Sequence, residues 1–192
     1  MSAILAIDTS TSRTSVGLIV NSELTWSAYE DGATAHAEAV PRLVQKALAI
    51  NNEISQVIVG MGPGPYTGLR AGISFAQAFA WARNLEVTGV CSLDAIVCKE
   101  SEYIAATDAR RKEIYWAKYL EGKRVDGPHV NVPAEVSGAV FVGEGAHKYG
   151  LCADATYPDV SVFHYLHAWI NQCIYVDPMP CQRWSDNGYY IS

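Results

Sequence analysis

Runs of apolar residues bounded by turn residues predict five strands in the N-terminal half of the chain. These strands are Ala3–Asp8, Thr14–Val20, Leu24–Tyr29, Val57–Met61 and Val87–Val90. Val40, Leu43, Val44 and Ala47 recur at helical spacing and predict a helix over residues 35–49, in which Pro41 marks a kink or a late start. A second helix is expected over residues 69–85, and a short one over Leu93–Cys98. Alternating strands and helices indicate a mixed sheet with helices packed on it.

A charged stretch at Lys99–Glu102 interrupts this pattern, and a second strand-rich part follows. It contains expected strands at Tyr103–Thr107, Ile114–Leu120 and Ala139–Val142, a turn and loop over Glu121–Pro128, and a terminal helix over Val162–Ile174. We therefore expect a fold of the α/β class in two parts: residues 1–100, and a smaller strand-rich part over residues 101–192.

A glycine-proline elbow connects the fourth strand to the second long helix. Its characteristic residues are Gly62, Pro63, Gly64, Thr67, Gly68 and Arg70. The glycines permit positive φ or close backbone approach, and the prolines restrict φ. The spacing fits neither a P-loop, which needs Gly-Lys-Ser/Thr, nor the dinucleotide fingerprint Gly-x-Gly-x-x-Gly. Two interpretations remain: a structural turn, and a backbone nest for an anion at the helix N-terminus.

Composition excludes several classes of function. The 192 residues carry a net charge of −6 with only 18% charged residues, so we expect that the chain does not bind nucleic acid by itself and that any contact with RNA is made through partners. The apolar start ends at Asp8, and no later run is long enough to span a bilayer, which predicts a cytoplasmic protein. Five cysteines without a Cys-x-x-Cys pair predict reduced thiols rather than a zinc site.

Isolated polar residues give no strong catalytic constellation. His36 and Glu38 lie two positions apart and do not share a helix face, so a surface or interface role is expected. His164 and His167 have no third ligand at helical spacing, and we assign no metal. Asp108, Arg110 and Arg111 fit either a catalytic group or a charged hairpin rim.

Five segments, in order, resemble the successive signatures of the TsaB (YeaZ) family. They are Ile4–Ser12, His36–Pro41, Gly62–Gly72, Asp108–Ala117 and Gly143–Ala146. The resemblance implies the two-subdomain actin, sugar-kinase and Hsp70-like fold, which is ribonuclease H-like. It also implies a non-catalytic partner of the TsaD transferase, which acts with the ATPase TsaE to install N6-threonylcarbamoyl on adenosine 37 of tRNA.

The chain differs from TsaD where TsaD has a His-x-x-x-His metal pair, because Gly89–Ile96 contains no histidine. Metal-dependent transfer is therefore not expected, and no cofactor is assigned. In sugar kinases of this fold the place of Asp8, Thr9, Ser10 and Thr11 is taken by a phosphate loop. Ser10 occupies the position of the glycine in that loop. Its side chain stands where a phosphate must approach the backbone, which weakens nucleotide binding. Retained ATP binding, there or at the junction with TsaD and TsaE, is the alternative.

The second long helix is apolar on all sides, which predicts that part of it contacts another subunit. We expect the helices at 35–49 and 69–85 to dock on TsaD, and on a second copy when TsaD is absent. The expected interface residues are His36, Val40, Leu43, Ala71, Gly72, Phe75, Ala76, Phe79 and Ala80. Two other function classes stay open, an ATP-dependent enzyme of this fold and a glycoprotease-like peptidase. No Gly-x-Ser-x-Gly elbow supports the peptidase.

Overall fold

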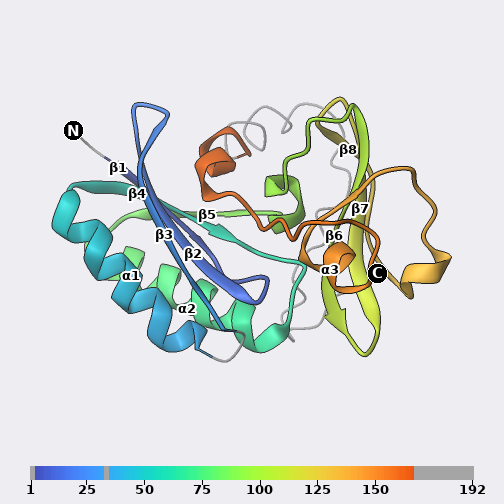
Figure 1. Cartoon of the computed structure of the whole chain (residues 1–192). Coiled ribbons are helices and arrows are strands. Elements are labelled where there is room, and N and C mark those ends of the chain that lie inside the picture. Colours follow the sequence, from blue (N-terminus) through green and yellow to red (C-terminus); the bar gives the residue numbers. More distant parts are fainter. Residues whose placement is uncertain (1–2, 33–34, 167–192) are drawn as a thin grey trace.

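A computed structural model describes residues 3–32 and 35–166, which form two sheets with helices packed between and around them (Figure 1). The first sheet has the strand order β3-β2-β1-β4-β5. Its strands are β1 (Ala3–Asp8), β2 (Arg13–Val20), β3 (Glu23–Asp31), β4 (Ile54–Gly60) and β5 (Glu86–Val90). β3, β2 and β1 pair antiparallel, whereas β1, β4 and β5 pair parallel.

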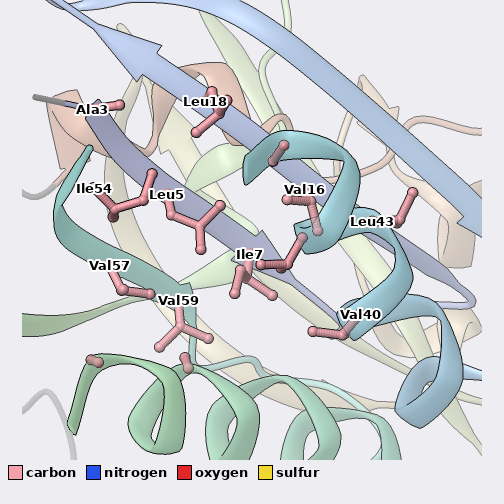
Figure 2. Close-up of a cluster of buried hydrophobic side chains, with 14 residues drawn as sticks. Ala3, Leu5, Ile7, Val16, Leu18, Val40, Leu43, Ile54, Val57 and Val59 are labelled. Carbon is pink, nitrogen blue, oxygen red and sulfur yellow. The ribbon is translucent and has the colours of Figure 1, made fainter. Parts of the chain in front are cut away.

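Helices α1 (His36–Ile50) and α2 (Tyr66–Arg83) cover one face of this sheet (Figure 1). Leu5 and Ile7 of β1 point toward these helices, together with Val57 and Val59 of β4 (Figure 2). Ala6 belongs to a second cluster on the opposite face. Because β1 and β4 are buried on both faces, they are almost continuously apolar instead of alternating.

The second face of the sheet is covered by the end of the described chain. The 3₁₀ turn η3 (Val160–Val162) and the helical residues that follow it place Val160 and Phe163 against Ile19, Ile58 and Val90. The sequence therefore returns to the first sheet after forming the second. The expected terminal helix has begun at Phe163, and its residues from 167 onward lie outside the described part.

The second sheet has the order β8-β7-β6-β9. It consists of β6 (Glu102–Arg110), β7 (Glu113–Leu120), β8 (Lys123–Asn131) and β9 (Phe141–Val142). The short helix α3 (Glu144–Lys148) packs on β6, and the 3₁₀ turns η1 (Ser92–Ala95) and η2 (Pro133–Glu135) complete the described elements. Tyr119 on β7 donates a hydrogen bond of 2.7 Å to Asp94 of η1, which ties the two sheets together.

Two sequence expectations for single elements are wrong. Residues 93–98 form only the short turn η1 and no α-helix. Residues 123–131 form strand β8, although Gly127 and Pro128 indicated a loop; β8 lies at the edge of its sheet, where proline is tolerated. Of the two possibilities for Pro41, the late start is excluded, because α1 begins five residues earlier; the kink stays a prediction.

Phe163 provides a test of the packing of η3. Its side chain is fully buried against the first sheet, so Phe163→Ala should lower the free energy of unfolding by about 3–5 kcal/mol. Chemical denaturation would measure this loss, with the exposed neighbour Tyr165→Ala as the control. An equal, small effect of both changes would contradict the packing described here.

Candidate functional site

The loop Asp8–Thr11 after β1 is buried and makes its hydrogen bonds within the protein. Asp8 Oδ1 accepts hydrogen bonds from the Ser10 amide at 2.9 Å and the Ser10 hydroxyl at 2.7 Å. Asp8 Oδ2 accepts one from Ser92 Oγ at 2.6 Å. Burial raises the pKa of the Asp8 carboxyl, and these hydrogen bonds oppose the shift only in part. The carboxylate is thus a structural acceptor that joins β1 to the turn after β5.

The elbow packs directly on this loop, with the backbone of one segment against the backbone of the other. A Cβ added to Gly64 would lie 2.1 Å from the Ser10 carbonyl oxygen, and one added to Gly68 would lie 2.7 Å from that of Thr9. Thr9 Oγ1 donates a hydrogen bond of 2.8 Å to the Gly68 carbonyl. Gly62 has a φ of 94°, a conformation that favours glycine. The glycines of the elbow therefore serve contact between two backbone segments.

This contact bears on the two interpretations of the elbow. Thr9, Ser10 and Thr11 are buried beneath the elbow, so protein occupies the space beside the loop. A phosphate group needs free backbone amides at such a place, but the Ser10 amide already donates to Asp8. The geometry favours a structural turn. Thr67 and Arg70 of the elbow region point outward, on the exposed side of α2.

His36 lies inside the protomer and not on its surface, which corrects the expectation from the sequence. The residue is 4% exposed, and its Nδ1 lies 2.7 Å from the Thr14 hydroxyl. Burial lowers the pKa of its imidazole, and nearby Arg110 lowers it further. Its ring also packs against Gly68, where an added Cβ would lie 3.1 Å from Cδ2 of the imidazole. His36 therefore joins the start of α1 to β2 and to the first turn of α2.

The stripe of small residues on α2 faces its own sheet. Gly72 packs against Thr9, and Ala76 and Ala80 lie in the core between the sheet and the helices. Val40 and Leu43 of α1 lie in the same core. The expectation that these five residues offer an exposed surface is wrong. Small side chains here let α2 approach the sheet, so Ala76→Arg would damage the fold before it tested an interface.

The opposite side of α2 is exposed and mostly polar, with Thr67, Arg70, Ser74 and Gln77, and its large apolar side chain is Trp81. Trp81 is 87% exposed and Tyr66 61% exposed, at the two ends of the helix. Phe75 and Phe79 are partly buried and stack with ring centres 6.0 Å apart. A shallow groove beside Trp81 is lined by Ser74, Gln77, Ala78, Ala80, Trp81, Leu85 and Val87, and Phe75 and Phe79 do not line it. Ala71, Phe75 and Phe79 are thus the expected interface residues that retain exposed surface.

Sequence reasoning missed Tyr66, Trp81 and Ser92. An aromatic residue in an apolar helix gives no sign of whether it faces the core, and Tyr66 was assigned to the turn. Ser92 stands where a metal-binding histidine was sought, and its hydroxyl instead bonds Asp8. Its place directly after the fifth strand was the available signal, because the ends of parallel strands meet at one edge of a sheet.

No nucleophile or metal site is evident in the described residues. They contain no group of three histidine, cysteine or acidic side chains that could hold a metal ion. Burial raises the pKa of the Cys91 thiol to about 12, which leaves it protonated at neutral pH.

Asp108 accepts hydrogen bonds from Lys148 and Tyr149, and Arg110 and Arg111 lie at the end of a hairpin, as the charged-rim interpretation expects. None of the described helices is both long and apolar enough to cross a membrane.

Comparison with known proteins defines the class of fold to which this chain belongs. The model of a family described as TsaD, tRNA N6-adenosine threonylcarbamoyltransferase, matches residues 29–161. The structure of YeaZ from Pseudomonas aeruginosa superposes with a TM-score of 0.74 at 26% identity, over 90% of this chain and 94% of that one. The fold is thus of the actin, sugar-kinase and Hsp70-like α/β class, as expected.

Sequence relatives narrow the class to a family. An uncharacterized protein of Mycobacterium bovis is 43% identical over 157 residues, which are 78% of this chain and 74% of that protein. The TsaB protein of Escherichia coli, a tRNA threonylcarbamoyladenosine biosynthesis protein, is 35% identical over 60% of this chain and 54% of its own length. The chain belongs to the TsaB/YeaZ family, within the wider group that the matching model describes.

Gly60 tests the close packing around Asp8. A Cβ on this residue would lie 1.9 Å from Asp8 Oδ2 and 2.6 Å from Ser92 Oγ. Gly60→Ala should therefore lower the free energy of unfolding by about 3 kcal/mol, measured by urea denaturation. Ser74→Ala on the exposed side of α2 is the control, with an expected change within about 0.5 kcal/mol. A Gly60→Ala protein as stable as the control variant would refute the contact.

Asp8 should leave a signature in the pH dependence of stability. Its pKa is raised in the folded state, so its ionisation opposes folding, and that cost grows as the pH rises from the ordinary aspartate value of about 4 through the folded pKa. Asn at this position does not ionise and keeps an acceptor oxygen for Ser10. The free energy of unfolding of the original protein, minus that of Asp8→Asn, should therefore fall over this interval. Thermal denaturation at several pH values would measure it, and a difference independent of pH would be the contrary result.

Proposed function

We propose that this chain is a cytoplasmic, non-catalytic subunit of the machinery that makes N6-threonylcarbamoyladenosine in tRNA. In this proposal it binds a TsaD-type transferase, and the assembly recruits a TsaE-type ATPase. Membership of the TsaB/YeaZ family supports the pathway, because curated members are named as biosynthesis proteins for this nucleoside.

Trp81 on the exposed side of α2 is the observation that carries the proposal of a protein partner. Single exposed apolar residues are ordinary, but Trp81 is 87% exposed and lines a shallow groove together with Ala78, Leu85 and Val87. Large aromatic side chains next to a groove are typical of the residues that dominate binding energy. An interface of standard size, about 1,200–2,000 Å² in total, would extend over both α2 and the exposed residues near it.

The engaged polar groups support a role without chemistry of its own. Asp8 accepts three hydrogen bonds, His36 is paired with Thr14, and Cys91 is protonated and contacts Arg124. A general base or nucleophile needs a free lone pair that substrate can reach. An ATP-dependent enzyme would need an open loop at Asp8–Thr11, and calorimetry with ATP and magnesium separates that alternative.

The same side of α2 also suits a homodimer. A two-fold axis would place α2 against α2 of a second copy, so that one patch meets itself. We therefore propose that self-association and binding of the transferase compete for this surface. Excess transferase should then convert the dimer into the mixed complex.

Trp81→Glu tests the interface. The substitution places a charge in the apolar surface while leaving the core intact, because the side chain is 87% exposed. We expect the affinity for the TsaD-type protein of the same organism, measured by calorimetry, to fall at least about 30-fold, which corresponds to a hot-spot loss of about 2 kcal/mol. Self-association measured by size-exclusion chromatography should weaken as well.

Val130→Glu is the matched control, since Val130 is an exposed apolar residue on β8, in the other sheet. It should leave both associations unchanged. If Trp81→Glu binds the transferase as tightly as the original protein, the outer side of α2 is not the interface. Failure of the original protein to bind the transferase at all would refute the proposed function itself.

A further inference from the structure

Three consecutive basic residues lie at the hairpin between β6 and β7: Arg110 ends β6, and Arg111 and Lys112 form the turn. Arg110, Arg111 and Lys112 are all exposed, and all have positive φ, at 66°, 51° and 68°. Left-handed backbone is costly for residues with a long side chain, and glycine or asparagine is the usual occupant. The turn thus keeps three cations at positions where other residues would fold more easily.

The other hairpin turns in the described part of the chain provide an internal comparison. The β2–β3 turn has Asn21 and Ser22 at positive φ, and the β7–β8 turn has Glu121 and Gly122. Both include a residue suited to this conformation. Turn formation alone therefore does not account for the basic residues between β6 and β7, and function is the remaining reason to consider.

Lys148 at the end of α3 extends this group, because both it and Arg110 approach the Asp108 carboxylate. Lys148 Nζ lies 2.7 Å from Asp108 Oδ2, and the Arg110 guanidinium lies 3.6 Å from it. The two cations remain 48% and 52% exposed. No ion pair involves Arg111 or Lys112 within residues 3–32 and 35–166. We call Arg110, Arg111, Lys112 and Lys148 the basic cluster. Against its four positive charges stand the buried carboxylate of Asp108 and that of Glu113, which faces Arg110 across the hairpin, so an excess of positive charge remains.

The surroundings indicate what kind of partner suits the basic cluster. Protein interfaces are built around an apolar centre. No large exposed apolar side chain of the described residues lies within 108–113 or 144–151, although Val130 and Val132 are exposed near the start of β7, where Asn131 pairs with Ile114. Contacts to a phosphodiester backbone need only exposed cations. The concentration of exposed cations therefore favours a nucleic acid over a protein.

The position of the cluster relates it to α2. Arg110 is close enough to His36 to lower the pKa of the imidazole, and the His36 ring contacts the first turn of α2 at Gly68. The cluster thus lies beside the N-terminal end of the helix whose outer side we propose as the partner interface. Figure 1 shows α3 beside β6, which places Lys148 next to the same hairpin.

We propose that the basic cluster contacts the phosphate backbone of the tRNA when the chain is assembled with its transferase partner. This inference rests on the proposed function. The net charge of −6 keeps the free chain from binding RNA by itself. Held at the edge of an RNA site supplied by the partner, the cluster adds phosphate contacts that carry no sequence information.

The test measures binding of a fluorescently labelled tRNA transcript to the complex with the TsaD-type protein, by anisotropy over a range of KCl concentrations. The variant Arg111→Asn with Lys112→Gly removes two charges and places residues that favour positive φ in the turn, so the fold is retained. We expect its affinity to be roughly tenfold lower at ~0.1 M salt, and the slope of log affinity against log salt to be smaller by about 1 to 2.

The control variant Lys99→Asn with Lys123→Asn removes the same charge at the other end of the second sheet. Glu121 there bonds Ser101, so both control positions lie near the β7–β8 turn. The control should bind tRNA with the original affinity and slope. Equal losses in both double variants would indicate only the change in net charge and would overturn the contact.

Three further outcomes overturn the inference and are distinguishable from one another. If the complex forms and the Asn-Gly variant binds tRNA with unchanged affinity and slope, the RNA contact is wrong and the proposed function is unaffected. If the variant loses the transferase itself on size-exclusion chromatography, the cluster is a protein contact. Absence of the complex with the original protein would refute the proposed function, and the inference with it.

Discussion

The close approach between the elbow and the loop after β1 is the contact on which the rest of the structure depends. The backbone of Gly64 and Gly68 lies where any side chain would meet the carbonyl oxygens of Ser10 and Thr9. This contact sets the direction in which α2 leaves β4, and hence which side of the helix covers the sheet. It also determines which aromatic residues remain on the outside. The helix can be placed in this way only because Gly64 and Gly68 have no side chains at the points of contact.

Burial of Asp8 extends the same arrangement to the second sheet. Its carboxylate bonds Ser92, and two residues later Asp94 accepts the hydroxyl hydrogen of Tyr119 from β7. Burial raises the pKa of Asp94, and the nearby Arg124 guanidinium opposes that shift. A polar group buried in this way is stable only while each partner is present. The hydrogen bonds of the loop after β1 thus extend through η1 to the second sheet.

The periodic apolar pattern predicted most of the elements, because the residues that repeat are the ones that the sheet and helices bury. It failed at β8, where Gly127 and Pro128 looked like a loop, since an edge strand leaves one side free of backbone pairing. It also failed at residues 93–98, where a few apolar residues without a full helical repeat formed only a 3₁₀ turn. The sequence motifs predicted the elbow and the loop after β1. They did not predict that these two segments contact each other.

The sequence by itself determined that α2 is a largely apolar helix and that at least one of its sides must be buried. Only the tertiary structure decided which side is which: Gly72 and Ala76 face the sheet, and Trp81 faces outward. Similarly, His36 could have been a surface residue or a buried one until its bond to Thr14 was known. The physical reason is that periodicity records how apolar a position is, whereas the neighbour that covers it comes from residues far away in the chain.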